Sequence, residues 1–364
     1  MNANSMVFNR LSTAMLWIAG WVAVNLGTGG EVLALQDRYT IVHTLPPGVS
    51  KWTVASDGSG QFTSIQEAID QAQEGDTIWI KSGTYAEDVT VFGKNRLKIV
   101  GESTEDVILS GLHRVGTLHI GKWPYGVQDV EIHALTVKQH GGLGVGIFNG
   151  GNLLLKHVRV EGMLYGQYVS HVLIEHCQIG GSETTGVGFA DSQAVLRSNF
   201  IHDNDHGVSI GGTSHLVLEQ NVITRHLYEA VLVSDSAQAM LIRNTLVRNG
   251  GGVTFRDQSR GEVRGNIIAY NRVGLQFSPA SRTKLAFNAV YHNAVPYQLI
   301  GTPPRPAPER AGKSDVTFAP LFVEPMADDF RLRPDSPLID IGGYPYLGAL
   351  PPLDGRRSSK FGSP

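Results

Sequence analysis

A ladder of asparagines in the middle of the chain constrains the fold more than any other feature of the sequence. Five of them recur at spacings of 22, 23, 22 and 22 residues: Asn199, Asn221, Asn244, Asn266 and Asn288. A second column lies five positions later in each unit and is asparagine in four of its five members: Asn204, His226, Asn249, Asn271 and Asn293. Each unit also holds two or three short stretches of alternating apolar residues, divided by Gly/Asn bends, which predicts short β-strands.

A unit of about 22 residues is typical of one coil of a parallel β-helix. It is too short for a propeller blade of about 40 residues, and it lacks both the helical turns of ankyrin and tetratricopeptide repeats and the frame of leucine-rich repeats. Asparagine tolerates the left-handed bend conformation, and its amide can hydrogen-bond the coils above and below in an internal ladder. We therefore predict an all-β fold, a single-stranded right-handed parallel β-helix of roughly ten coils.

Proline usage supports this fold and marks where it ends. Of the 17 prolines, 13 lie at or after Pro296, and only Pro124 and Pro279 occur between Gly48 and Val295. Because proline removes a donor from a β-ladder, few prolines are expected within stacked coils. The 43 glycines supply many of the bends that such coils need.

The flanks predict caps at both ends of the stack and an exported chain. The capping box Ser64-x-x-Glu67 precedes apolar residues at helical spacing, which predicts a short N-terminal capping helix. Arg10 followed by the apolar run Leu11–Leu26 is typical of a signal peptide, with an uncleaved anchor as the alternative. We expect a secreted or periplasmic monomer with no membrane span in the mature chain. The predicted organisation is a signal peptide (1–34), a linker (35–51), the β-helix with its N-terminal cap (52–295), a Pro-rich linker (296–314), an irregular C-terminal cap (315–350) and a disordered tail (351–364).

Charge and cysteine content narrow the classes of function. The net charge is −3 with histidines neutral, so no basic excess is present to bind nucleic acid. The single cysteine, Cys177, excludes an intramolecular disulfide framework and a cysteine-based zinc site. Cys177 lies 22 residues before Asn199, so we expect it to face inward in the asparagine column.

Three segments carry a resemblance to known families. Val54–Phe62, Ile65–Ile69 and Gly83–Glu87 resemble the opening of pectin methylesterases and related β-helix proteins. The middle of the chain resembles the pectin lyase-like parallel β-helix superfamily of polysaccharide lyases, hydrolases and uronate epimerases. The tail, from Asp329 to Ala349, resembles the closing segment of exported bacterial β-helix proteins. The resemblance implies the fold and suggests a polysaccharide as partner, but fold alone does not specify the reaction.

Most candidate site residues lie in the bends before the third strand of each unit, whereas Arg256 follows such a strand and Trp123 lies in a separate loop. Neighbouring coils place polar residues there that suit proton abstraction next to a uronate carboxylate: a His or Tyr as base, a second group as acid, and an Arg to neutralise the carboxylate. Asp203–Gly207 also faintly resembles the Asp-Pro-His-Asp/Glu motif of alginate C5-epimerases, although Asn204 replaces the Pro and the His falls one place late. The catalytic candidates are His206, Asp205, Tyr228, Arg248 and Arg256, and the substrate-binding candidates are Glu229, His226, Arg272, Tyr270 and Trp123.

Other interpretations remain open at this point. The same residues would serve as simple bend residues in a non-catalytic glycan-binding or scaffold β-helix. A pectinesterase-like hydrolase is a further alternative, but the Gln-Asp-Thr-Leu and Asp-Phe-Ile-Phe-Gly motifs of that family are missing. We expect no metal site and no other cofactor, although carboxylates on separate coils (Asp191, Asp203 and Asp235) could bind Ca²⁺. An enzyme requires that His206, Tyr228 and either Arg248 or Arg256 share one open groove.

Overall fold

The computed structural model describes residues 50–113 and 116–353. The predicted signal peptide, nearly all of the linker before the β-helix and most of the predicted tail lie outside the described residues. Within these ranges, no helix has the length and apolar character needed to cross a membrane.

A short helix closes the N-terminal end of the stack, as the capping box predicts. Helix α2 (Ile65–Gln71) follows strand β1 (Lys51–Val54), and Ser64 Oγ accepts a hydrogen bond from the backbone N–H of Glu67. Glu87 adds a second cap, because its carboxylate accepts from the backbone N–H groups of Ile65 at 2.8 Å and Gln66 at 3.0 Å. The apolar side of α2 is buried against the first coils, so the helix covers the open sheet edge there.

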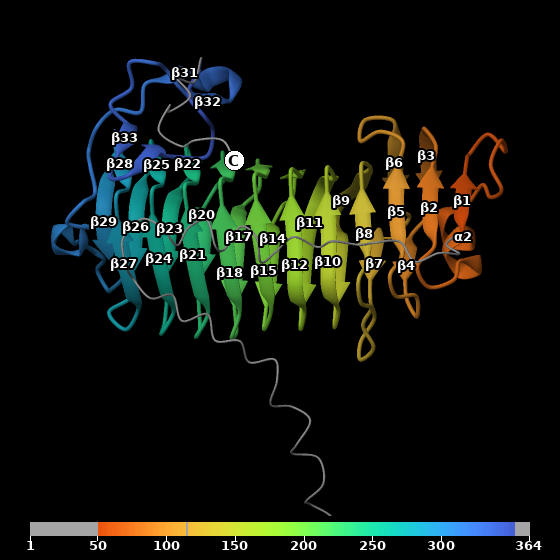
Figure 1. The fold of residues 1–364 in the computed structure, drawn as a ribbon. Helices are drawn as coiled ribbons and strands as arrows, with labels where there is room; N and C mark the ends of the chain where they lie inside the picture. The colour runs from red at the N-terminus through yellow and green to blue at the C-terminus, as the bar shows by residue number, and fades with distance from the viewer. Residues whose placement is uncertain (1–49, 114–115, 354–364) are drawn as a thin grey trace, which may run out of the picture. The chain divides into compact units, whose positions relative to one another are not determined.

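Eleven parallel strands stack side by side to form the first face of a parallel β-helix (Figure 1), which confirms the predicted fold. They are β1, β2 (Thr77–Ile80), β5 (Lys98–Gly101), β8 (Glu131–His133), β10 (Gly151–Lys156), β12 (Ser170–Glu175), β15 (Gln193–Arg197), β18 (His215–Glu219), β21 (Gln238–Ile242), β24 (Arg260–Arg264) and β27 (Arg282–Ala286).

Two further columns of strands complete each coil. The second face holds β3 (Gly83–Ala86), β6 (Val107–Ser110), the first parts of β9 (Thr136–Phe148) and β11 (Arg159–Gln167), β13 (Gln178–Gly180), β16 (Phe200–His202), β19 (Val222–Thr224), β22 (Thr245–Val247), β25 (Ile267–Ala269) and β28 (Ala289–Tyr291). The third face holds β4 (Val89–Val91), β7 (Leu118–Ile120), the second parts of β9 and β11, β14 (Thr185–Ala190), β17 (His206–Gly211), β20 (Glu229–Val233), β23 (Gly251–Phe255), β26 (Val273–Phe277) and β29 (Val295–Leu299). Alternate residues of every strand point inward and form one apolar core.

The two asparagine columns form internal ladders. Asn221 Oδ1 accepts from both the backbone N–H of Asn199 at 3.0 Å and its side-chain amide at 2.9 Å. The same pair of bonds repeats down the first column as far as Asp315, which receives both donors of Asn288. Cys177 heads this column, because its backbone N–H donates to Asn199 Oδ1, and burial raises the pKa of its thiol to about 12. These bonds satisfy polar groups inside the coils that water cannot reach.

The C-terminal part of the chain packs on the outside of the second face. Strand β29 still pairs in parallel with β26, so regular coils continue a few residues past the predicted boundary at 295. Strand β30 (Arg305–Pro306) then pairs antiparallel with β29. The elements that follow are η2 (Pro308–Arg310), β31 (Phe322–Glu324), η3 (Pro325–Ala327), β32 (Asp329–Leu332), β33 (Ile339–Ile341) and β34 (Tyr344–Tyr346). Apolar side chains such as Phe330 and Leu347 pack on Val247 and Ile267, over β19 to β28, where Figure 1 shows this cap.

Candidate functional site

One coil is a residue longer than its neighbours, and the extra residue shapes the candidate site. Two residues separate Asn204 from Gly207, whereas three separate His226 from Ala230. The strands stay in register across this difference, since Val208 still pairs with Val231. The bend absorbs the insertion by turning Leu227 and Tyr228 outward, and these side chains are 63% and 50% exposed.

Four side chains meet on the outer side of the third face, and we call them the His206 cluster: His206, Tyr228, Glu229 and Arg256. His206 begins β17, and its Nδ1 lies 3.0 Å from Oε2 of Glu229, the first residue of β20. This is an ion-pair distance between the imidazole and the carboxylate. The Tyr228 ring stacks on the His206 ring with centroids 5.0 Å apart. Arg256, directly after β23, places Nη2 3.5 Å from Glu229 Oε1.

The electrostatics of the cluster favour an ionised Glu229. Burial by itself raises the pKa of this carboxyl group, because its side chain is only 12% exposed. The adjacent His206, the residue's own backbone N–H and the Arg256 charge outweigh burial, so the pKa of Glu229 lies below its ordinary value. Arg256 is 52% exposed, so its guanidinium can also reach a ligand in solvent.

Comparisons with family models cover two parts of the chain. Residues 136–297, which include the His206 cluster, match the family described as periplasmic copper-binding protein (NosD). Residues 51–120 match the family Pectinesterase. A comparison with curated proteins found no match.

Solved structures with the same architecture include several polysaccharide-modifying enzymes. The mannuronan C-5 epimerase AlgE6 A-module of Azotobacter vinelandii is 17% identical, with a TM-score of 0.55 over 63% of this chain and 72% of that one. Pectate lyase Pel9A is 12% identical, with a TM-score of 0.53 over 84% and 98% of the two chains. A mutant of the periplasmic alginate epimerase AlgG is 15% identical, with a TM-score of 0.50 over 71% and 68%.

The chain is a right-handed parallel β-helix protein. At such low identities the likeness extends to the fold and not to the activity, because β-helices with different chemistry share this architecture. The function of this β-helix protein therefore has to be argued from its site.

Among the predicted catalytic residues, Asp205 adjoins the cluster and Arg248 does not. Asp205 directly precedes His206, and its carbonyl accepts the backbone N–H of Tyr228 at 2.8 Å. Arg248 instead points to the C-terminal cap: its Nη2 lies 2.8 Å from Met326 Sδ, and its guanidinium lies 5.9 Å from the Phe330 ring. Of the two arginines considered from the sequence, only Arg256 therefore shares the third face with His206.

His226 lies inside the coil and not in a groove, since only 3% of it is exposed. It takes the place of an asparagine in the second ladder: its ring Nδ1 accepts the backbone N–H of Asn204 at 3.2 Å, and the backbone N–H of His226 donates to Asn249 Oδ1 at 3.0 Å. Burial lowers the pKa of His226 to about 4. His226 therefore cannot contact a substrate in this structure.

The remaining binding candidates lie on other parts of the surface. Tyr270 packs against Tyr291 and His292, with ring centroids 5.7 Å apart in both cases, and Arg272 is exposed directly before β26. Trp123 is 66% exposed in the loop after β7, and its ring centroid lies 5.5 Å from that of Tyr168. None of these three belongs to the His206 cluster.

Sequence reasoning missed two polar residues of the third face next to the cluster. Thr254 Oγ1 lies 3.5 Å from Glu229 Oε1, and Ser209 Oγ lies 3.3 Å from Thr185 Oγ1. Both stand between inward-facing apolar residues, as in Val208-Ser209-Ile210, so strand alternation marks them as outward positions.

The carboxylates considered for Ca²⁺ are engaged separately. Asp203 pairs with Arg225 at 2.8 Å and His202 at 2.7 Å, and the bond from Arg225 is the main reason that its pKa falls to about 2. Asp191 and Asp235 accept backbone N–H groups of adjacent bends, those of Thr213 and Gly212. Among residues 50–113 and 116–353, no group of three or more His, Cys, Asp or Glu side chains is arranged to hold a metal.

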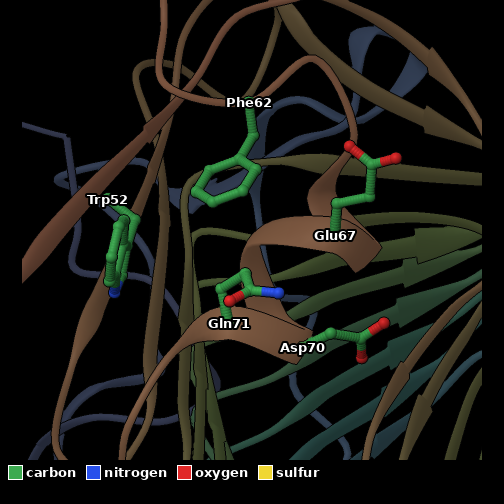
Figure 2. A pocket seen from close by; sticks show the side chains of 5 residues that line it. All are labelled: Trp52, Phe62, Glu67, Asp70 and Gln71. Carbon is green, nitrogen blue, oxygen red and sulfur yellow. The ribbon is translucent and has the colours of Figure 1, made fainter.

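A pocket of about 490 Å³ lies at the other end of the stack, between β1 and α2. Figure 2 shows Trp52 and Phe62 on one side and three α2 side chains, Glu67, Asp70 and Gln71, on the other. The two aromatic rings contact edge to face at 5.7 Å. These five lining residues include no cation to bind a uronate, so the His206 cluster is the better candidate site despite its open surface.

Proposed function

We propose that the protein acts on an acidic polysaccharide by removing the C5 proton of a uronate residue, as a lyase or a C5-epimerase. One observation carries the proposal: Glu229 links His206 on one side to Arg256 on the other, with Tyr228 stacked on His206, on the outer side of the third face. His206 and Tyr228, which can accept and donate a proton, therefore lie close to the positive charge of Arg256, with Glu229 between His206 and Arg256.

The chemistry assigns a role to each group. The C5 proton becomes removable when the negative charge that develops on the carboxylate is stabilised, and Arg256 supplies a half-exposed positive charge for this. His206 and Tyr228 are the base and acid: one accepts the C5 proton and the other donates a proton. In a lyase the electron pair from C5 expels the oxygen at C4, which takes up a proton. In an epimerase a proton returns to C5 from the opposite face. Because the His206 and Tyr228 rings stack on each other and so lie on one side of C5, water supplies this proton.

Glu229 is a positioning residue in this scheme. Its carboxylate is nearly buried and lies between the imidazole and the guanidinium, so it orients both without facing the solvent. Asp205 is the last residue of the bend before His206, and its carbonyl accepts the backbone N–H of Tyr228. The Tyr228 ring in turn limits the rotation of the His206 ring.

The comparisons support this proposal at the level of the fold and the compartment. The three solved structures compared above are described as a mannuronan epimerase, a pectate lyase and an alginate epimerase. The matching family and the epimerase AlgG are both described as periplasmic. We therefore propose that this protein works in the periplasm or outside the cell.

Alginate, pectate, pectin and hyaluronan are the substrates to test, with ultraviolet absorbance to detect unsaturated products and NMR to detect inversion at C5. We expect one polymer to react, and expect His206→Ala and Arg256→Ala each to lower the rate about 100-fold. His215→Ala and Arg260→Ala, on the exposed first face, are matched controls that should keep wild-type rates. If none of the four polymers is altered, or if the His206 and Arg256 variants match wild type, the proposal is wrong.

A glycan-binding protein without catalysis is the second candidate. Arg256 already pairs with Glu229, which reduces the positive charge available to the reacting carboxylate. Binding of a polymer that depends on Arg256, without any change in the bound polymer, would favour this function.

A further inference from the structure

An aromatic surface on the third face leads toward the His206 cluster from the N-terminal side. The outward positions there pair coil by coil: His119 with Gly146, Gly146 with Tyr165, Tyr165 with Gly188, and Gly188 with Ser209. The Phe148 ring lies 6.0 Å from the His119 ring and 6.4 Å from the Tyr165 ring.

Two glycines allow these rings to lie over the sheet. A Cβ on Gly146 would stand 2.7 Å from Phe148 Cε2, and a Cβ on Gly188 would stand 3.0 Å from Tyr165 Cδ2. The Tyr165 ring therefore extends over the neighbouring strand β14 toward β17, where Ser209 and His206 lie. With coils about 4.8 Å apart, the Tyr165 backbone is about 10 Å from that of Ser209 along the stack.

A second aromatic pair borders the same face. Trp123, 66% exposed, and Tyr168, 48% exposed, lie 5.5 Å apart in the bends that follow β7 and β11. Burial, and after it the negative charge of Asp191, raise the pKa of the Tyr165 phenol, so its hydroxyl stays a neutral hydrogen-bond donor. We call Phe148, Tyr165, Tyr168 and Trp123 the aromatic platform.

The outward side chains beyond the cluster have a different character. Leu232 pairs with Ser209 and comes next in the column. Thr254, which pairs with Leu232, is fully buried, and its hydroxyl bonds Gln276, whose amide in turn bonds Gln298. These polar groups already bond one another, whereas the platform leaves aromatic faces in contact with solvent. The two sides of the His206 cluster are therefore unequal.

We propose that the aromatic platform binds the sugar residues of the acidic polysaccharide on one side of the reacting residue, so that the chain lies along the stack and extends from His206 toward Trp123. Aromatic rings stack on the C–H faces of sugar rings, the Thr185 and Ser209 hydroxyls lie next along the face, and Arg256 receives the carboxylate of the reacting residue. The choice of a uronate chain as occupant rests on the proposed function and on the continuity of the platform with the cluster.

The test measures binding as a function of chain length. Calorimetry with mannuronate and galacturonate oligomers of increasing length should show wild-type affinity rising with length for one of the two series. Tyr165→Ala should bind the long oligomers about tenfold more weakly and the shortest bound oligomer unchanged. Gly188→Ala keeps the ring but displaces it, and should weaken long oligomers in the same way.

A control variant separates the platform from general effects. Phe318→Ala removes an exposed aromatic side chain from the C-terminal part of the chain, away from the platform, so it should bind like wild type. If Tyr165→Ala and Gly188→Ala bind long oligomers like wild type, the platform does not bind the sugar chain, and this result leaves the proposed reaction at His206 untouched. If length-dependent binding is lost in these variants but wild type alters no polymer, sugar binding by the platform is supported and the proposed reaction at His206 is refuted. If neither oligomer series binds to wild type, both proposals are wrong.

Discussion

The backbone N–H of Asn204 donates to Nδ1 of His226 at 3.2 Å, at the one position of the second ladder where the partner is not asparagine. In the first ladder an asparagine oxygen accepts both donors of the preceding asparagine, as Asn221 does for Asn199. The imidazole nitrogen accepts only one, and the side-chain amide nitrogen of Asn204 is buried without a partner. The second ladder therefore lacks one hydrogen bond, at Asn204, two residues before His206.

His226→Asn should stabilise the protein. An asparagine oxygen at this position can accept both donors of Asn204, and its amide can donate to the Ile201 carbonyl, as Asn249 does to Ile223. We expect the free energy of unfolding to rise by about 1 kcal/mol, measured by denaturant unfolding. The matched variant Asn221→His leaves Asn199 with the same defect and should lower the free energy of unfolding by about 1–3 kcal/mol. A loss of stability in His226→Asn would contradict this account.

The pH dependence of stability should also change in His226→Asn. Burial lowers the pKa of His226 from 6.5 to about 4, so between these pH values the unfolded chain takes up a proton that the folded chain does not. Stability is therefore lost as the pH falls below 6.5, by about 3 kcal/mol in total, and levels off below pH 4. The difference in unfolding free energy between His226→Asn and wild type should grow over this range. Parallel pH profiles would show that His226 is not responsible.

The fold was predictable from the sequence, whereas most of the site was not, and the difference has a physical cause. Each ladder asparagine must meet the next one coil later, so Asn199 and Asn221 impose a period that is visible in the sequence. Outward residues have no such constraint. The sequence does not distinguish Arg248 from Arg256 as the candidate cation. The structure does, because Arg248 contacts Phe330 and Met326, some 80 residues further along the chain, and so points away from His206. His226 stands in the second column of the sequence pattern, but only the structure shows that its side chain is buried in the ladder and does not face a groove.

Deletion of Leu227 should remove the His206 cluster and keep the fold. The deletion restores the length of the neighbouring coils, so the second asparagine column keeps its register while Tyr228 loses its place on the His206 ring. We expect the free energy of unfolding to change by no more than about 1 kcal/mol, because Leu227 is mostly exposed. Activity on the polymer that wild type alters should fall about 100-fold, measured as initial rate. Wild-type activity in the folded deletion variant would exclude a role for Tyr228.

Glu229→Gln should separate substrate binding from catalysis. The substitution removes the negative charge that pairs with Arg256, so the guanidinium becomes free for a substrate carboxylate and KM should fall severalfold. The same change leaves His206 without the carboxylate that holds its ring, so kcat should fall about tenfold or more. Steady-state kinetics on the reactive polymer measures both constants. Glu262→Gln is the matched control, because Glu262 pairs with Arg264 at 3.2 Å on the first face, away from the cluster, and should leave both constants unchanged. If KM and kcat of Glu229→Gln equal those of wild type, Glu229 neither positions His206 nor competes for Arg256.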